Sequence, residues 1–382
     1  GMFPYEHFLM PEEPVGQGVF GFRAKLDGGI GKWFRYSLHH QLGATVTSEV
    51  MSLTMSPTGG GSGDEIPQAV DLSWAAVEAT NHTISGRMDR MFVSFRVPHL
   101  DITVGRQPVY FGSAFFFTPM DLVSPFSPVV IDREYKPGID SVRADIFIGM
   151  SGKISVVAAY AGSWDWEGTI LAAHGGFTVG VFDLGIFAGE IHKSTVLGLD
   201  FTGAIGPVAV YGEATVTLEK DETPFVRAVV GGSHRFGFGL TLMGEFYVQS
   251  LGGADASDYL PLTATERFQR GELWAMGRYY GALTATYEIG PLMSASVFVV
   301  SNLRDPSFLV GPGLSWSVAD NAVLGAGLYL ALGERLGEMD EMDFLNPDFT
   351  LKSEEELLAS IPVNSEFGMS PSMAYLNLKV YF

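Results

Sequence analysis

The chain has 382 residues, no cysteine and a formal net charge of −20. The absence of cysteine excludes a disulfide framework, a thiolate metal site and a cysteine nucleophile, and the acidic balance argues against a nucleic-acid partner. No run of roughly eighteen apolar residues occurs, which excludes a transmembrane helix. The first ten residues have neither the basic start nor the apolar core of a signal peptide, so we expect a mature chain.

Segments of about nine to thirteen residues alternate between apolar and polar side chains along nearly the whole chain. In residues 208–218, for example, Val210 and Val216 alternate with Tyr211, Glu213 and Thr215. A soluble sandwich has the same period of two. A membrane barrel is favoured because the strands are long enough to cross a bilayer at a tilt, and because the polar faces carry large and charged residues while the apolar faces stay aliphatic over many consecutive hairpins.

This alternation predicts one all-β domain over residues 1–382, a single transmembrane antiparallel β-barrel with about eighteen strands, or sixteen as the alternative. The predicted strands are 14–27, 31–41, 43–55, 86–97, 100–110, 139–150, 152–162, 168–179, 181–191, 193–204, 206–218, 224–235, 237–249, 273–289, 291–302, 306–318, 320–332 and 370–382. The division at Leu42-Gly43 rests mainly on the even strand count that closure requires when both termini are periplasmic.

The connections alternate in length, with tight turns such as Pro98-His99 and Gly290-Pro291 on one side. Short periplasmic turns and long extracellular loops are typical of the bacterial outer membrane, which is therefore the expected location. The last strand sets Asn377 and Lys379 against apolar neighbours and ends in Phe382, which resembles the terminal signature of outer-membrane proteins. The predicted long loops are 55–85, 111–138, 250–272 and 331–370.

Residues 111–138 combine an aromatic cluster, several prolines and a charged tail. A connection of this length inside a compact domain is usually either functional or disordered, and this one is too aromatic to be disordered. We expect it to fold into the barrel and narrow the lumen. The alternative is an external cap over the mouth.

Six short motifs occur in order within residues 86–148. They are Asp89-Arg90, Gly105-Arg106-Gln107, Phe111-Gly112, Pro119-Met120-Asp121-Leu122, Pro125-Phe126-Ser127-Pro128 and Ile131-Asp132-Arg133-Glu134-Tyr135-Lys136. This pattern resembles porin-like outer-membrane proteins of Gram-negative bacteria and is similar to alginate-export-type porins. Phe111 stands where that group usually has Trp, and Thr118 where it usually has Asn. The resemblance implies a barrel but no particular ligand.

Charged residues on the polar strand faces and in the 111–138 loop are the candidates for the pore lining and its constriction. They are Arg90, Arg96, Arg143, Asp145, Arg227, Arg278, Glu213, Glu245, Asp121, Asp132, Arg133 and Glu134, and Asp200 and Glu288 lie on the same faces. These charges either set the field and selectivity of a pore or neutralise one another in a structural network. Arg106 falls on the apolar side by strict alternation, and we expect a bulge to turn it inward rather than leave it at the membrane rim.

No sequence motif indicates an enzyme, a metal site or a cofactor. The eight histidines show no metal-binding spacing, and no nucleophile elbow is present. The acidic loop 331–370 either binds divalent cations near lipopolysaccharide or is simply solvated, and a helical turn is predicted within residues 352–360.

The sequence therefore predicts a porin-like channel for passive diffusion of small hydrophilic solutes. Its expected partners are outer-membrane lipid, lipopolysaccharide and a small-molecule solute. The alternative function is a barrel component of an envelope export or lipid-transfer assembly, which would add a periplasmic or envelope protein partner.

Overall fold

The computed structural model describes residues 16–47, 67–79, 81–123, 135–166, 168–220, 222–337 and 354–382. These residues form one sheet of 18 antiparallel strands, with a few short helices in the connections. The elements are β1 (Gln17–Ile30), β2 (Phe34–Thr47), β3 (Ser73–Ala79), β4 (His82–Val97), β5 (Leu100–Gln107), β6 (Ile139–Ile148), β7 (Gly152–Tyr160), β8 (Thr169–Val179), β9 (Phe182–Ile191), β10 (Ser194–Ile205), β11 (Val208–Leu218), β12 (Phe225–Arg235), β13 (Leu240–Gln249), η1 (Ala256–Asp258), α2 (Tyr259–Thr263), α3 (Glu266–Gln269), β14 (Tyr279–Gly290), β15 (Met293–Asn302), β16 (Ser307–Ala319), β17 (Ala322–Leu332), α4 (Glu354–Ser360), η3 (Phe367–Met369) and β18 (Met373–Val380).

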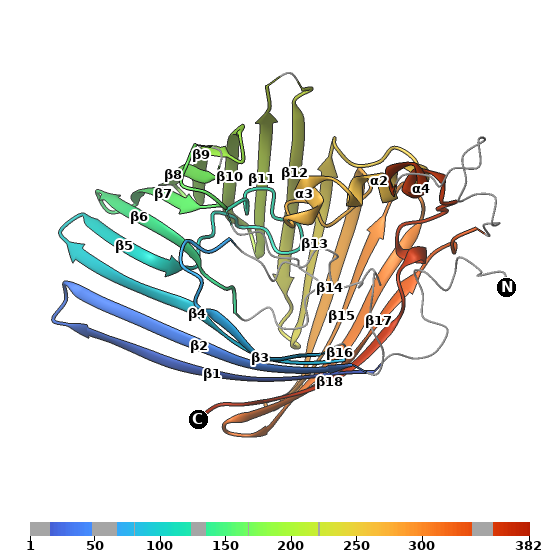
Figure 1. Ribbon diagram of the computed structural model, residues 1–382, viewed down its shortest axis with the longest axis horizontal. Helices are drawn as coiled ribbons and strands as arrows, with labels where there is room; N and C mark the ends of the chain where they lie inside the picture. The colour runs from blue at the N-terminus through green and yellow to red at the C-terminus, as the bar shows by residue number, and fades with distance from the viewer. Residues whose placement is uncertain are drawn as a thin grey trace.

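The sheet curves into a β-barrel (Figure 1). From β4 to β18 each strand pairs with the next strand along the chain, and β2 joins β1 to β4. Short turns such as those between β1 and β2 and between β4 and β5 lie at one end of the wall, whereas α2, α3 and α4 lie at the other. No described helix is both long enough and apolar enough to span a membrane.

The predicted alternation of side chains is confirmed by burial in the wall. On β10, Leu197 and Leu199 are exposed on the outer face while Val196 is buried on the inner face. On β11, Glu213 and Thr215 are likewise buried on the inner face. An apolar outer face over consecutive strands is what lipid requires, because polar side chains are costly in contact with hydrocarbon.

The strand division at Leu42-Gly43 is wrong. β2 is one strand of 14 residues, and it pairs with β1 without interruption, with Leu42 opposite Phe22 and Gly43 opposite Gly21. The eighteenth strand is β3, which lies within the predicted 55–85 loop. One edge of β4 pairs with β2 along most of its length. The other edge pairs with β3 at His82–Arg87 and with β5 from Met91 to Val97. The total count was right only because these two errors cancel.

The predicted bulge at Arg106 is also wrong, because a bulge lies on the neighbouring strand instead. β5 keeps a regular register with β4 and β6 through Arg106, so Arg106 shares the face of Ile102 and Val104. The register shift lies in β4 at Asp89. It reverses the alternation there, which turns both Arg87 and Arg90 toward the inside of the barrel.

Arg106 is nevertheless buried, with 3% of its surface exposed. Its Nε and Nη2 atoms hold the two carboxylate oxygens of Asp140 at 2.8 and 2.9 Å. Its guanidinium also donates to the carbonyl of Val70, and the amide of Ala69 donates to Asp140. The segment before β3 therefore covers this ion pair, so that Arg106 needs neither a lumen position nor a snorkelling one.

The long connections contain local structure of their own. The helical turn expected within 352–360 is confirmed by α4, whereas residues 338–353 of the same loop lie outside the described residues. Apolar residues from 251–277 pack against residues from 333–369 in one buried cluster. This cluster comprises Tyr259, Leu260, Phe268, Leu273, Met276, Leu336, Ile361, Val363 and Met369. We call it the mouth cap.

Candidate constriction of the lumen

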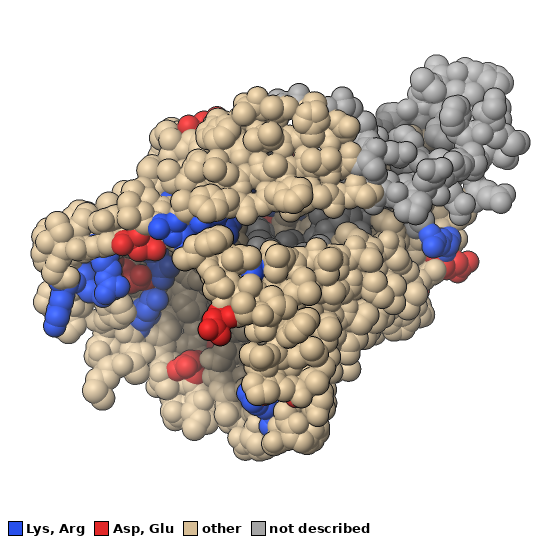
Figure 2. All heavy atoms as spheres, turned by 90° about the horizontal axis from the view of Figure 1, so that it is seen from below, with Lys and Arg blue, Asp and Glu red and all other residues tan. Residues whose placement is uncertain are grey.

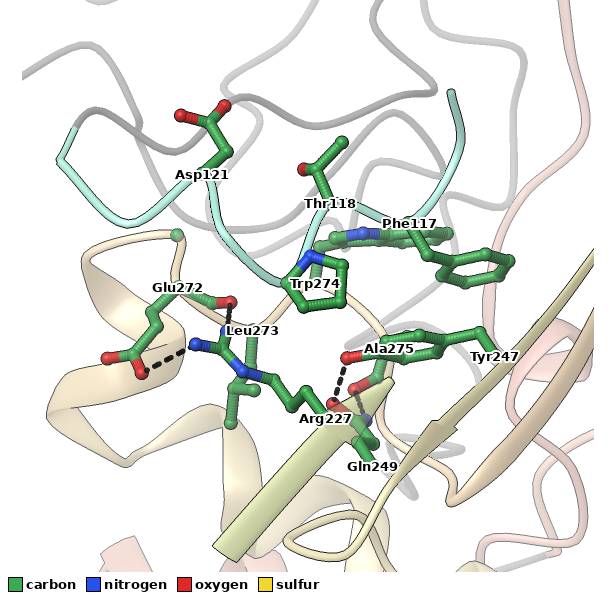
Figure 3. Close-up of a pocket in the computed structure, with 12 residues that line it drawn as sticks. Phe117, Thr118, Asp121, Arg227, Tyr247, Gln249, Glu272, Leu273, Trp274 and Ala275 are labelled. Carbon is green, nitrogen blue, oxygen red and sulfur yellow. Dashed lines mark hydrogen bonds and ion pairs between the residues drawn. The ribbon is translucent and has the colours of Figure 1, made fainter. Parts of the chain in front are cut away.

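Residues 108–123, called here the inner segment, lie against the inner face of the wall. Phe117 is 1% exposed, and its ring stacks on Tyr247 at 4.5 Å and on Trp274 at 5.2 Å between centroids (Figure 3). Tyr247 belongs to β13 and Trp274 to the connection that leads to β14. Stacked aromatic pairs stabilise a contact beyond their buried area, so this cluster fixes the middle of the inner segment.

Two carboxylates of the wall bind the backbone of the inner segment. Glu245 on β13 accepts hydrogen bonds from the amides of Phe115, Phe116 and Phe117 at 2.7, 3.0 and 3.1 Å, and from the Tyr211 hydroxyl at 2.8 Å. Glu213 on β11 accepts hydrogen bonds from the amides of Ser113, Ala114 and Met120. Hydrogen bonds to ionised acceptors are about twice as strong as neutral ones.

The two carboxylates also supply acceptors for backbone amides that would otherwise have none. An irregular segment inside a barrel has amide groups with no sheet partner, and each would be costly if left buried without an acceptor. Glu213 and Glu245 are themselves 3% and 5% exposed, so the amides satisfy the carboxylates as well. The two acidic residues therefore lie on the inner face but are covered by the inner segment, which separates them from the open lumen.

The other described part of the 111–138 loop, residues 135–138, contacts the wall on β1, β2 and β4. The ring of Tyr135 lies between two guanidinium groups, 3.6 Å from Arg23 and 4.1 Å from Arg90. Its hydroxyl is 2.7 Å from Nδ1 of His39. Arg90 also donates to the carbonyl of Lys136 at 2.8 Å. Cation–π contacts on both ring faces hold this end of the loop.

A hydrogen-bonded ion pair joins the two described ends of the loop, because Lys136 donates to Asp121 at 2.5 Å. The inner segment contacts β6–β14, because Val109, Phe111 and Met120 also pack in a buried cluster with residues of β6–β10. Tyr135 instead contacts β1, β2 and β4, on another part of the wall (Figure 1). Residues 124–134 lie outside the described residues, and with them Asp132, Arg133 and Glu134.

Basic residues gather on the inner face of the β1–β7 side of the wall, which we call the basic arc. Acidic side chains are fewer there than basic ones. Asp145, for example, pairs with both Arg143 and Lys153, at 3.0 and 3.5 Å. Figure 2, seen from below the view of Figure 1, shows Lys and Arg around the hollow at the left, on the side of the β1–β2 hairpin. The basic arc consists of Arg23, Lys25, Arg35, Arg87, Arg90, Arg96, Arg143 and Lys153.

The remaining candidates from the sequence lie in separate contacts. Arg96 pairs with Asp101 at 2.9 Å on the basic arc. On the far side of the wall Asp200 pairs with His174 at 2.7 Å and Glu288 with Arg235 at 2.8 Å. Two arginines lie at the end of the barrel that carries α2, α3 and α4. Arg227 donates to the carbonyl of Glu272, and Arg278 donates to the carbonyl of Gly252.

Sequence reasoning missed Arg23, His39, Tyr135 and Trp274 as parts of the site. Tyr135 stood within a recognised motif, but nothing in the motif shows that its ring would lie between Arg23 and Arg90. Those contacts join residues far apart in the chain, so no local pattern could have identified them. Among the described residues, no group of three or more histidine or acidic side chains is placed to hold a metal ion.

A buried polar network joins the mouth cap to the wall. Glu366 accepts hydrogen bonds from the Met276 amide at 2.8 Å and from the Asn302 side chain at 2.7 Å, and also from the Tyr280 hydroxyl. Burial raises the pKa of Glu366 to about 7, against the lowering effect of these donors. The cap is therefore attached to the ends of β14 and β15 through a titratable group.

No family model and no curated protein matches this sequence. Solved structures match over most of the chain. OccK5 (OpdH) of Pseudomonas aeruginosa is 9% identical, with 84% of this chain and 88% of that one covered and a TM-score of 0.51. OccK9 (OpdG) of the same organism is 10% identical, with 85% and 88% covered and a TM-score of 0.50. Wzi, a carbohydrate-binding β-barrel involved in capsule assembly in Escherichia coli, is 9% identical, with 85% and 81% covered and a TM-score of 0.48.

At this level of identity the likeness concerns the fold. The shared fold and the apolar outer face of the strands fit the outer-membrane location that the sequence predicts. The likeness to alginate-export-type porins stays a prediction from the sequence motifs.

Proposed function

We propose that this chain is a passive diffusion channel for small hydrophilic solutes and that it prefers anions. The observation that carries the proposal is the unequal use of the two sides of the wall. Glu213 and Glu245 are covered by the inner segment and saturated by its amides, whereas Arg35, Arg96 and Lys153 on the basic arc are exposed. Charges that remain at the lumen surface set the field that a permeating ion meets.

In this proposal the 111–138 loop is the constriction. The inner segment is held to β11–β14 by carboxylates and aromatic rings, and Tyr135 holds the other end to the basic arc. A barrel of about eighteen strands is wide enough for an aqueous path beside such a loop. Solutes then pass between the inner segment and the basic arc.

The test is the reversal potential of purified protein in a planar bilayer under a potassium chloride gradient. The proposal expects chloride to permeate more readily than potassium, and Arg96→Ala combined with Arg143→Ala to reduce that preference. Arg235→Ala is the matched control, because Arg235 is an exposed, ion-paired residue on the opposite side of the wall. Cation preference in the wild type, or an equal effect of the control, refutes the anion preference.

The second candidate is a barrel that serves an envelope export or lipid-transfer assembly. The dense packing around the inner segment favours it, since Phe116, Phe117, Tyr247, Tyr280 and Phe367 belong to one buried cluster. A barrel that shows no conductance and co-purifies with periplasmic proteins supports this candidate over the channel.

A further inference from the structure

Four buried polar atoms without a hydrogen-bond partner lie on the inner face where β11 meets β12. They are Nε and Nη2 of Arg227 and the hydroxyls of Thr215 and Thr217. Thr215 is directly opposite Arg227 in the sheet, and Thr217 is opposite Phe225. All three polar side chains are at most 3% exposed. Buried polar atoms nearly always have a partner, so a cluster of four indicates a group that binds there.

The two unpartnered atoms of Arg227, Nε and Nη2, form the edge with which arginine binds both oxygens of a carboxylate. Its Nη1 donates to the carbonyl of Glu272 at 3.1 Å, but Nη2 is 3.5 Å from the nearest Glu272 carboxylate oxygen. That is longer than the roughly 2.7–2.9 Å of a charge-assisted bond. In the same protein, the Nε–Nη2 edge of Arg106 binds both oxygens of Asp140 at 2.8 and 2.9 Å. The corresponding edge of Arg227 has no such acceptor among the described residues.

The surrounding charges leave a positive excess. Glu272 is shared by three arginines, Arg227, Arg267 and Arg270, at 3.5, 2.9 and 3.0 Å. Glu219 compensates Arg267. The other acidic neighbour of Arg270 is Glu266, whose side chain is 96% exposed and 3.7 Å away, so it contributes little. Nε of Arg270 also lacks a partner. A buried positive charge without a counter-ion is costly, which favours uptake of an anion.

We propose that a small monovalent anion, either a halide ion or the carboxylate end of a solute, binds to the Nε–Nη2 edge of Arg227 and the hydroxyls of Thr215 and Thr217. Thr215 and Thr217 lie beside Arg227 in the sheet, and the cavity in Figure 3 borders Arg227 and is lined also by Thr118 and Trp274. It is small, so only an ion or the end of a molecule enters. The site does not depend on the proposed channel function, because a closed barrel would bind the same anion.

The experiment measures the fluorescence of Trp274, which lines the cavity beside Arg227. Full-length protein in detergent is titrated with sodium bromide or sodium formate, with sodium methanesulfonate keeping the ionic strength constant. The Trp274→Phe variant identifies the part of the signal that belongs to Trp274. We expect a saturable change in the wild type, and binding weakened at least tenfold by Arg227→Met and several-fold by Thr215→Val.

The control is Arg235→Met, since Arg235 lies on the same strand and inner face but pairs with Glu288 at the other mouth. It should leave the titration unchanged. Saturation by bromide identifies a halide site, and saturation by formate alone identifies a carboxylate site. A strictly linear response in the wild type, or wild-type binding in Thr215→Val, overturns the proposal. Thr215→Val keeps the side-chain volume, so it decides the question if Arg227→Met fails to fold.

Discussion

Replacing Glu245 by glutamine should release the inner segment without removing any apolar contact. The carboxylate accepts four hydrogen bonds, two at Oε1 from Phe115 and Tyr211 and two at Oε2 from Phe116 and Phe117. A glutamine can keep one pair through its carbonyl oxygen. With the carbonyl in place of Oε2, the amide nitrogen faces the Tyr211 hydroxyl, which can turn to accept from it, and the Phe115 amide, which is left without an acceptor.

The size of the effect follows from these bonds. One unsatisfied amide costs about 1–3 kcal/mol, and the retained hydrogen bonds lose their charge assistance. The contacts of the inner segment should therefore weaken by about 2–4 kcal/mol. Since about 1.4 kcal/mol is tenfold in an equilibrium constant, the ratio of detached to attached segments should rise by at least roughly twentyfold.

Hydrogen exchange of the amides of residues 113–117, followed by mass spectrometry, measures this ratio, and single-channel conductance measures its consequence. Exchange should accelerate in Glu245→Gln, and the conductance should rise because the segment no longer narrows the lumen. Glu288→Gln is the control, because that exposed ion pair contributes at most about 1 kcal/mol. Exchange at the wild-type rate in Glu245→Gln would refute the reasoning.

Three further changes test other contacts of the same region. Tyr135→Leu removes two cation–π contacts of about 1–2 kcal/mol each, so the amides of residues 135–138 should exchange hydrogen faster, whereas Tyr287→Leu on the outer face should not change that rate. Phe117→Ala removes a fully buried ring and should destabilise the inner segment by about 3–5 kcal/mol, and unchanged conductance would show that the segment does not narrow the lumen. For Glu366 the pKa is raised by burial to about 7, so the folded cap binds the proton more tightly than the unfolded chain. The stability of the mouth cap should therefore fall by about 3 kcal/mol as pH rises from about 4.5 to 7. Faster hydrogen exchange of the cap amides measures this loss, and Glu366→Gln should abolish the pH dependence.

The sequence by itself determined the barrel wall. A period of two places alternate side chains on opposite faces, and lipid on one side with polar groups on the other leaves only one way to orient each strand. Glu213, Glu245 and Tyr247 were therefore assigned to the inner face correctly from alternation. The connection after β5 was recognised as unusual for a physical reason too, because an aromatic segment of that length must pack against something.

Only the tertiary structure decided which residues meet inside the barrel. Strand β3 was missed because it is short and completes the wall by pairing with one part of β4, which no local pattern specifies. The bulge at Asp89 exists only in relation to the partner strand β2. Likewise, Glu213 and Glu245 looked like lumen charges until the amides of the inner segment were found to occupy them. Sequence periodicity reports the face of a side chain, whereas its partner depends on strand register and chain path, which are properties of the whole fold.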